Sequence, residues 1–403
     1  MDDTIRVLFM QSQSYFGSDS MIQSLLMRYL NRERVTVHAA CNPGTRTHRS
    51  GSIKALTEIP NLHLRPTLFG PTINSQSKTA VARATIDGTL PMLTSLGGLA
   101  RYVRKHRIQI LHGTEKPRDA FYGILLARLT GAKIIVHVHV KAADWMSPLT
   151  RWAMRHADGL LGVSAFVEES LHAAGYCPSR TFHVVNSLDL SQWNSSIDGS
   201  TVRQEFGVTD TTALLAIIAR IFPWKGHMDL IKALALVKEH NPNFRLLVVG
   251  EDDPRATPGG QSYTAELRRL VHDLNLTEHV TFTGFRSDVA QILAAADVFT
   301  MPSYEEPCAV AYIEAMAMRK PVVALDGSIG GGGGTRELVL NGQAGLLSQA
   351  HDIRHLAENI LRLINDPDLR QRMGTFGRAR VEQYLNPKRM ADETEEVYRR
   401  LLC

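Results

Sequence analysis

The sequence has few cysteines and no long apolar run. Its four cysteines, Cys41, Cys177, Cys308 and Cys403, stand far apart and form no metal-binding or redox spacing, so free thiols are the simple interpretation. No apolar run reaches the roughly 18–20 residues that a membrane span needs. The N-terminus also lacks the basic and then apolar segments of a secretory signal. These absences predict a cytoplasmic globular protein.

Charge is unevenly distributed along the chain. Residues 1–200 contain 22 basic and 14 acidic side chains, and the remainder contains 23 and 26, so the two parts carry net charges of +8 and −3. A basic first half suits an anionic acceptor or an anionic membrane, and it equally suits a plain solvated surface. No recognition motif or basic–aromatic stripe is present, so we expect no nucleic-acid partner.

Strand-like and helix-like segments alternate along both halves, which predicts α/β domains with parallel sheets and helices on both faces. Helices are expected at 21–30, 117–129, 166–174 and 228–238, with Ser164 capping the third of them. The expected strands are 6–10, 35–40, 108–112, 134–140, 159–163 and 183–185 in the first half, and 213–219, 245–250, 280–283, 298–301 and 321–325 in the second.

A chain of 403 residues suits two domains. Residues 187–200 are short, polar and aperiodic, so we place a hinge there and predict domains at 1–190 and 201–387. The amphipathic last helix, 388–403, is expected to pack back on the first domain. The polar residues 70–90 lack a pattern and are interpreted as a mobile loop near the interdomain side.

The residues that carry chemistry centre on the stretch from Glu306 to Glu337. Glu306 stands at a strand-to-helix junction, Glu314 lies on the following helix, and the glycine run 330–334 precedes another helix start. Glycines ahead of a helix expose backbone N–H groups at the positive end of its dipole, which suits phosphate. A carboxylate on a nearby helix suits the hydroxyls of a ribose. Together they predict a nucleotide-linked ligand.

Two cations accompany this stretch. Arg220 ends a strand, and Lys225 precedes Gly226 and a helix. Cations at the carboxyl end of a parallel strand line the crevice where such folds bind ligands, and two of them with the glycine amides suffice to neutralise a diphosphate without a metal. The alternative is a strand-end arginine and an exposed lysine with no role.

The two glutamates are a poor match for a glycoside-hydrolase pair. Eight residues of helix separate them by about 12 Å, whereas the hydrolases need roughly 5–9.5 Å. The spacing better suits two contacts on one elongated ligand, with Glu306 near a sugar and Glu314 near a ribose. A solvent-facing helical acid is the alternative for Glu314, and Glu305 is interpreted as a surface acid.

His137 and His139 are predicted on one face of a strand, because the strand period is two. His139 is nearer the carboxyl end and is the functional candidate, while His137 is expected to be structural. With His112 they invite a zinc site, but no carboxylate or cysteine completes it, so we predict no metal. Asp366-Pro367-Asp368 is formally a metal–diphosphate D-x-D, yet it reads as a helix N-cap followed by proline.

These residues resemble the retaining nucleotide-sugar glycosyltransferase family 4, which has the GT-B fold. The family's E-x7-E motif corresponds to Glu306 and Glu314, and Arg220 with Lys225-Gly226 resembles its diphosphate-binding pair. Asn186 and Asp189 resemble the hinge motif. Cys308 and Ala309 stand where many members have Phe and Gly. The resemblance implies donor contacts from Gly17, Arg220, Lys225, Phe285, Arg286, Glu306, Cys308, Ala309, Val310, Glu314, Gly333 and Gly334, and catalytic roles for His139, Glu306, Arg220 and Lys225.

The resemblance implies two Rossmann-like domains that face a central cleft, with the acceptor bound by the first and the donor by the second. The implied reaction is metal-independent transfer of a sugar, with retention, from a nucleotide diphosphate sugar to a hydroxyl of a glycan, glycolipid or natural product. We expect a UDP-sugar donor and no cofactor. A lipid-linked acceptor and peripheral contact with an anionic membrane are further expectations. A nucleotide-sugar epimerase and a non-catalytic sugar-nucleotide binder are the alternatives.

Overall fold

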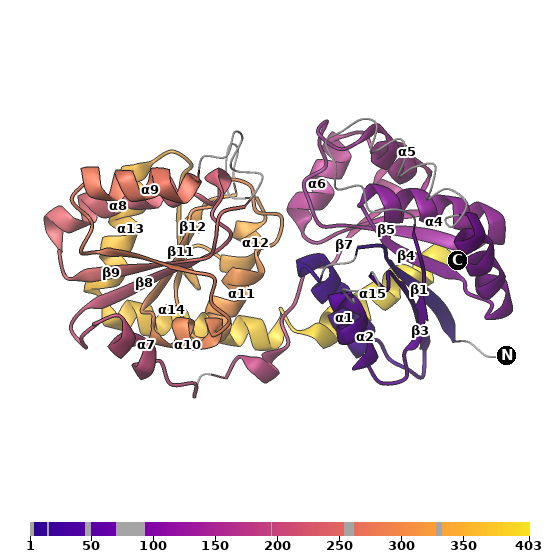
Figure 1. The fold of residues 1–403 in the computed structure, drawn as a ribbon, viewed down its shortest axis with the longest axis horizontal. Coiled ribbons are helices and arrows are strands. Elements are labelled where there is room, and N and C mark those ends of the chain that lie inside the picture. The colour runs from indigo at the N-terminus through magenta and orange to yellow at the C-terminus, as the bar shows by residue number, and fades with distance from the viewer. Residues whose placement is uncertain are drawn as a thin grey trace. The chain divides into compact units, whose positions relative to one another are not determined.

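Figure 1 shows the computed structural model, which describes residues 4–13, 16–44, 50–69, 93–194, 196–253, 262–327 and 333–403. The expected loop at 70–90 and Gly330 to Gly332 of the glycine run lie outside these residues. The chain divides into two compact units. The first unit comprises residues 1–186 and 387–403, and the second comprises residues 187–386.

The first unit is built on a seven-stranded sheet in the order β3-β2-β1-β4-β5-β6-β7, and all of its paired strands are parallel. Its central strands are buried along almost their whole length, as expected where helices cover both faces. The strands are β1 (Ile5–Gln11), β2 (Val35–Cys41), β3 (His63–Pro66), β4 (Ile110–Thr114), β5 (Lys133–Val138), β6 (Gly159–Gly162) and β7 (Thr181–His183).

The helices of the first unit connect these strands, and one of them comes from the far end of the chain. Ser164 caps α6 by accepting a hydrogen bond from the Val167 N–H, as predicted. The helices are α1 (Ser18–Tyr29), α2 (Gly51–Thr57), an unlabelled helix over 93–105, α4 (Pro117–Thr130), α5 (Pro148–His156), α6 (Ala165–Ala173), the 3-10 turn η1 (Pro178–Arg180) and α15 (Pro387–Leu402).

The second unit repeats the architecture with a six-stranded parallel sheet in the order β10-β9-β8-β11-β12-β13. The strands are β8 (Ala213–Ile218), β9 (Phe244–Val249), β10 (Val280–Gly284), β11 (Val298–Met301), β12 (Val322–Leu325) and β13 (Gly345–Ser348). The helices are η2 (Leu190–Gln192), α7 (Ser200–Glu205), η3 (Pro223–Lys225), α8 (His227–His240), α9 (Tyr263–Asp273), α10 (Val289–Ala295), α11 (Val310–Ala317), α12 (Thr335–Val339), α13 (Ile353–Asn365) and α14 (Pro367–Gln383).

The strands predicted from the sequence are present, with ends shifted by one or two residues. β3 and β13, each four residues long, were not predicted. Asp366 caps α14 by accepting the Leu369 N–H at 2.8 Å, and Pro367 is the first helical residue. The D-x-D therefore has the structural role expected of it.

The boundary between the units falls four residues earlier than the predicted end of the first domain at 190. The Leu188 N–H donates to the Leu385 carbonyl at 3.1 Å, and Arg378 donates to the Trp193 carbonyl at 2.6 Å. These bonds attach the predicted hinge at 187–200 to the second unit. Pro387, placed in the second domain by the prediction, begins α15 in the first unit.

Both sheets change direction at a defined pair of strands. In the first unit the order reverses between β1 and β4, and in the second it reverses between β8 and β11. In open parallel sheets the crevice outside the carboxyl ends of such a pair is the usual ligand site. A ligand site is therefore expected at the carboxyl ends of β1 and β4 in the first unit, and at those of β8 and β11 in the second.

Candidate active site

In the second unit the loops after β8 and β11 join at the predicted lysine and glutamate. Lys225 Nζ lies 2.5 Å from Glu306 Oε2, and the Ser303 hydroxyl donates to the same carboxylate at 3.1 Å. Both charged side chains are largely buried, with 16% and 12% of their surfaces exposed. A pair so desolvated is held in place before any ligand arrives.

Glycine makes this approach of loops feasible. Gly226 has φ of 77°, and a Cβ there would stand 2.0 Å from the Pro302 carbonyl oxygen. Gly333 has φ of 58°, and its Cβ would stand 2.4 Å from the Glu306 carbonyl oxygen. Only glycine tolerates both restraints. The end of the glycine run is thus packed against Glu306.

The expected role of Gly334 needs correction. Its N–H donates to the Glu306 carbonyl at 2.8 Å, so this amide is already engaged and is not free to bind phosphate. Gly334 is the N-cap residue of α12, and its N–H bonds the end of the glycine run to the backbone of Glu306. The sequence pattern placed the glycines beside a helix start, but it could not show that their partner is the chain itself.

Arg220 follows β8 and pairs with Asp253, which follows β9. The arginine side chain remains 62% exposed, while the aspartate side chain is 3% exposed. A buried carboxylate therefore anchors one edge of a guanidinium whose remaining donors face outward. Such an arrangement suits bidentate binding of a phosphate.

Glu314 lies on α11, whereas Glu306 lies in the loop before it, so the two are not eight helical residues apart as the predicted 12 Å assumed. No cation pairs with Glu314 within the described part of the chain. Burial alone raises its pKa to about 7. A carboxyl group that is partly neutral at physiological pH is well suited to exchange hydrogen bonds with ligand hydroxyls.

The residues predicted to contact the nucleobase and the sugar differ in exposure and in whether they already have partners within the chain. The Phe285 ring is 73% exposed. Arg286 instead donates to Glu205 and Asp288, at 2.6–2.9 Å, so its guanidinium is committed to ion pairs. Cys308 and Ala309 are buried, and Ala309 is the N-cap of α11, which starts at Val310.

In the first unit His139 follows β5 rather than lying on it, because the strand ends at Val138. The ring centroids of His137 and His139 are still only 4.2 Å apart, with the ring planes tilted by 36°. His112 Nε2 lies 3.2 Å from His137 Nδ1, and His112 Nδ1 lies 2.7 Å from the Tyr398 hydroxyl. Burial lowers the pKa of His112 to about 3 and that of His137 well below its ordinary value.

These three histidines form a row of adjacent rings that ends at His139. The Nε2 atoms of His137 and His139 are buried and have no partner among the described residues. No group of three or more His, Cys, Asp or Glu that could hold a metal occurs among those residues.

Sequence reasoning missed a charged group beside His139. Lys116 Nζ lies 2.9 Å from Asp19 and 3.2 Å from Glu115, and the His139 N–H donates to Glu115 at 3.2 Å. Burial on its own would raise the pKa of Asp19, but His139 and Lys116 outweigh it and hold the pKa below its ordinary value. Glu115-Lys116 directly after a strand was the available signal.

The remaining candidates hold positions that fit a framework role. Gly17 is the N-cap of α1, so it directly precedes the first helix after β1. Asn186 is buried at the unit boundary, and its side-chain oxygen lacks a partner among the described residues. Asp189 caps η2 by accepting the Ser191 N–H at 3.0 Å.

Two doubly wound parallel sheets, with a lysine–glutamate pair and an arginine at the switch point of the second, define a glycosyltransferase of the GT-B fold. Two family models match the chain. "Glycosyl transferase 4-like domain" matches residues 23–186, and "Glycosyl transferases group 1" matches residues 199–380.

Curated relatives agree. The chain is 31% identical to the GDP-mannose-dependent monoacylated alpha-(1-6)-phosphatidylinositol monomannoside mannosyltransferase of Corynebacterium glutamicum, over 73% of this chain and 77% of that protein. It is 30% identical to the GDP-mannose-dependent alpha-(1-6)-phosphatidylinositol monomannoside mannosyltransferase of Mycolicibacterium smegmatis, over 72% and 76%. The chain belongs to glycosyltransferase family 4 and is a hexosyltransferase.

Solved structures share the fold. Anabaena Alr3699/HepE in complex with UDP and glucose matches with a TM-score of 0.76 and 22% identity, over 98% of this chain and 99% of that one. Sucrose-phosphate synthase from Thermosynechococcus elongatus matches with a TM-score of 0.74 and 21% identity, over 99% of both. Among the described residues, no helix combines the length and apolarity that crossing a membrane requires.

Proposed function

We propose that the protein transfers a hexose, with retention and without a metal ion, from a nucleotide diphosphate sugar to a hydroxyl acceptor. The bond from the sugar's anomeric carbon to the diphosphate breaks, and a bond from that carbon to the acceptor oxygen forms. The acceptor proton passes to the departing phosphate oxygen. No protein side chain needs to become covalently attached.

The observation that carries this proposal is the joining of Lys225 and Glu306 at the switch point of the second unit. Negative charge grows on the leaving diphosphate, and Lys225 with the exposed guanidinium of Arg220 stabilises it, which is usually the largest contribution to such catalysis. When the donor binds, the Lys225 ammonium group leaves the Glu306 carboxylate and pairs with a phosphate oxygen of the diphosphate. The released carboxylate is left to bind the hydroxyls of the sugar. Glu314 is assigned to the ribose, and His139 of the first unit to the acceptor.

GDP-mannose is the first candidate donor. The two relatives at 30–31% identity are both named as GDP-mannose-dependent. A UDP-sugar, which the sequence led us to expect, is the second candidate, because similar folds have been solved with UDP and UDP-glucose.

The test is a thermal-shift screen with GDP, UDP and ADP, followed by turnover with the matching sugar nucleotides. A ligand at 100 times its dissociation constant stabilises a protein by about 2.7 kcal/mol, so the nucleotide that binds stands out. Release of nucleotide together with a glycosylated acceptor supports the proposal. An isomerised sugar nucleotide formed without acceptor contradicts it and supports an epimerase.

We also propose that the first unit makes peripheral contact with an anionic membrane. Trp145 and Leu149, just before and within α5, are 66% and 42% exposed, and Arg155 in the last turn of that helix is also exposed. Exposed tryptophan beside arginine suits the boundary between lipid headgroups and acyl chains. Co-sedimentation with anionic and neutral vesicles tests this. Trp145→Ser should weaken binding to anionic vesicles, whereas Phe376→Ser on α14 should not.

A further inference from the structure

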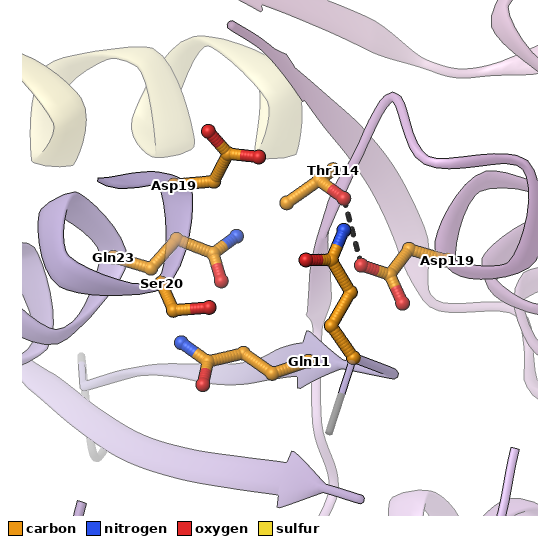
Figure 2. Close-up of a pocket in the computed structure, with 7 residues that line it drawn as sticks. Gln11, Asp19, Ser20, Gln23, Thr114 and Asp119 are labelled. Atoms are coloured by element: carbon orange, nitrogen blue, oxygen red, sulfur yellow. Dashed lines mark hydrogen bonds between the residues drawn. The ribbon is translucent and has the colours of Figure 1, made fainter. Parts of the chain in front are cut away.

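A small polar pocket lies at the switch point of the first unit, where β1 and β4 end. Figure 2 shows Asp19, Ser20 and Gln23 of α1 on one side, and Thr114 and Asp119 on the other. Gln11, the last residue of β1, also lines it. Its free space is close to the smallest that holds a water-sized group.

Two amides in this pocket have no hydrogen-bond partner. Gln11 is 3% exposed and Gln23 is fully buried, and neither side-chain oxygen nor nitrogen of either residue is satisfied by the described residues. An amide buried without a partner costs about 1–3 kcal/mol. Two such groups aimed at one space are therefore expected to share an occupant.

Three other side chains of the lining already have partners. The Thr114 hydroxyl donates to Asp119 at 2.7 Å, and the Ser12 N–H donates to the other oxygen of Asp119 at 2.9 Å. Asp19 is paired with Lys116 at 2.9 Å. Gln13 also lines the pocket. The buried side-chain atoms of the lining that lack a partner among the described residues belong to the Gln11 and Gln23 amides, each of which can donate and accept.

We propose that this pocket receives one hydroxyl or hydroxymethyl group of a neutral polyol or sugar acceptor, bound by the amides of Gln11 and Gln23. A hydroxyl both donates and accepts, so it can satisfy one amide oxygen and one amide nitrogen together. The inference rests on the proposed function, since it says which acceptors that reaction takes.

The charges around the pocket favour a neutral occupant over a phosphate. Two carboxylates, Asp19 and Asp119, line it, and the nearby cation Lys116 is shared between Asp19 and Glu115. A phosphate placed there would meet two acids and no free cation among the described residues. Burial raises the pKa of Asp119 to about 6, so this acid is largely ionised at neutral pH.

The experiment measures transfer by the full chain with its working sugar nucleotide and three acceptor probes: methyl α-mannoside, myo-inositol and mannose 6-phosphate. Gln11→Met and Gln23→Met keep the side-chain length and remove the amide. Each should raise the KM for the preferred neutral probe at least tenfold and leave the KM for the donor unchanged. The melting temperature should not fall, because an apolar isostere replaces an unpaired polar group.

A deoxygenation series makes the assignment specific. In the wild-type protein, removing one particular hydroxyl of the neutral probe should raise its KM about as much as Gln23→Met does. In Gln23→Met the same deoxygenation should have little further effect, since the two changes remove one interaction. This wild-type arm holds even if a variant fails to fold. Gln204→Met, on exposed α7, is the matched control and should change nothing.

The outcomes separate cleanly. Unchanged acceptor KM with a lowered melting temperature means that the pocket holds only a structural water, and the inference fails while transfer stands. If mannose 6-phosphate, bound through its phosphate group, is used as well as the neutral probes are, the proposal that the pocket selects neutral acceptors is wrong. If the wild-type protein transfers no sugar at all, the proposed function fails. Saturation-transfer NMR of methyl α-mannoside and myo-inositol then decides: loss of signal in Gln23→Met supports the pocket, and an equal or absent signal overturns it.

Discussion

The two units carry the same kind of sheet but treat their polar groups in opposite ways. In the second unit, Lys225 pairs with Glu306, Arg220 with Asp253, and Arg286 with Glu205 and Asp288. In the first unit, Gln11 and Gln23 at the corresponding switch point have no partner among the described residues. The second unit pairs its charged side chains with one another, whereas the first unit, beside the Lys116–Asp19 and Lys116–Glu115 pairs, also buries two amides without partners among the described residues.

This difference explains why the site residues of the second half could be predicted from the sequence and the buried amides of the first half could not. A charged site that is satisfied internally demands fixed residue types at fixed spacings, such as the two glutamates and the lysine–glycine pair. A neutral site can be assembled from amides on any elements that meet.

The strongest way to break the comparison is to remove the lysine. Lys225→Ala should lower the transfer rate about 10³-fold, because a charge aimed at the leaving diphosphate is lost. It also leaves Glu306 largely buried without its cation, so the melting temperature should fall. Steady-state kinetics with saturating acceptor check the rate. Lys232→Ala, at an exposed position of α8, is the control, and a loss below tenfold for Lys225→Ala would contradict the charge-based site.

Acid should destabilise the first unit. Burial lowers the pKa of His38 to about 4 and of His112 to about 3, and it also lowers that of His137. His38 and His112 each contribute stability that is complete above pH 6.5 and is lost as the pH falls, by about 2 kcal/mol at pH 5. Asp119, with its pKa raised to about 6, offsets part of this.

In the second unit, the protonation of two buried groups in acid has opposite effects on the free energy of unfolding. His227, with its pKa lowered to about 4, loses stability in acid, while Glu314, with its pKa raised to about 7, regains it. Amide hydrogen exchange at pH 7 and pH 5, corrected for intrinsic rates, should show β4 and β5 losing more protection than β8 and β11. Equal losses in both sheets would remove this distinction.

Glu314 permits a sharper test within the second unit. Its raised pKa means that the folded protein pays an increasing penalty as the pH rises from about 4.5 to 7. Glu314→Gln removes that penalty, so the variant should be more stable than the wild type by about 3 kcal/mol at pH 8 and equal to it near pH 4. Urea unfolding at the two pH values measures this. An identical difference at both would mean that the carboxyl group is not the cause.

The smallest expected effects concern the nucleobase loop. Phe285→Ala should weaken nucleotide binding several-fold with no loss of stability, because the ring is exposed and held by little else. Arg286→Ala should cost about 1 kcal/mol of stability, because it breaks two ion pairs, and should change nucleotide affinity little. Calorimetry with the preferred nucleotide and thermal melting separate them. A reversed pattern would return Arg286 to the binding site.

Much of the fold was predictable, because buried parallel strands and their intervening helices leave apolar runs of recognisable length. The lysine–glutamate contact was implied by the motif, since both residues follow strands that neighbour each other at a switch point. The engagement of the Gly334 amide, the ion pairs of Arg286 and the position of His139 beyond β5 were not. Each of these features depends on which loop packs beside the residue in the folded unit, and the spacing of residues along the chain does not determine that contact.

The pocket of Gln11 and Gln23 was missed for the same reason. A glutamine at the end of a strand and another on a helix are unremarkable in sequence, and only the folded first unit shows that both amides are buried without partners.

The return of α15 to the first unit has a consequence for domain exchange. Tyr398, at the far end of the chain, is fully buried and reaches His112, and Glu395 on the same helix is buried beside Arg34. The first unit is therefore encoded in two separate stretches of gene. A chimaera that borrows specificity from a relative must transplant both stretches together, or the grafted half will lack the helix that completes its core.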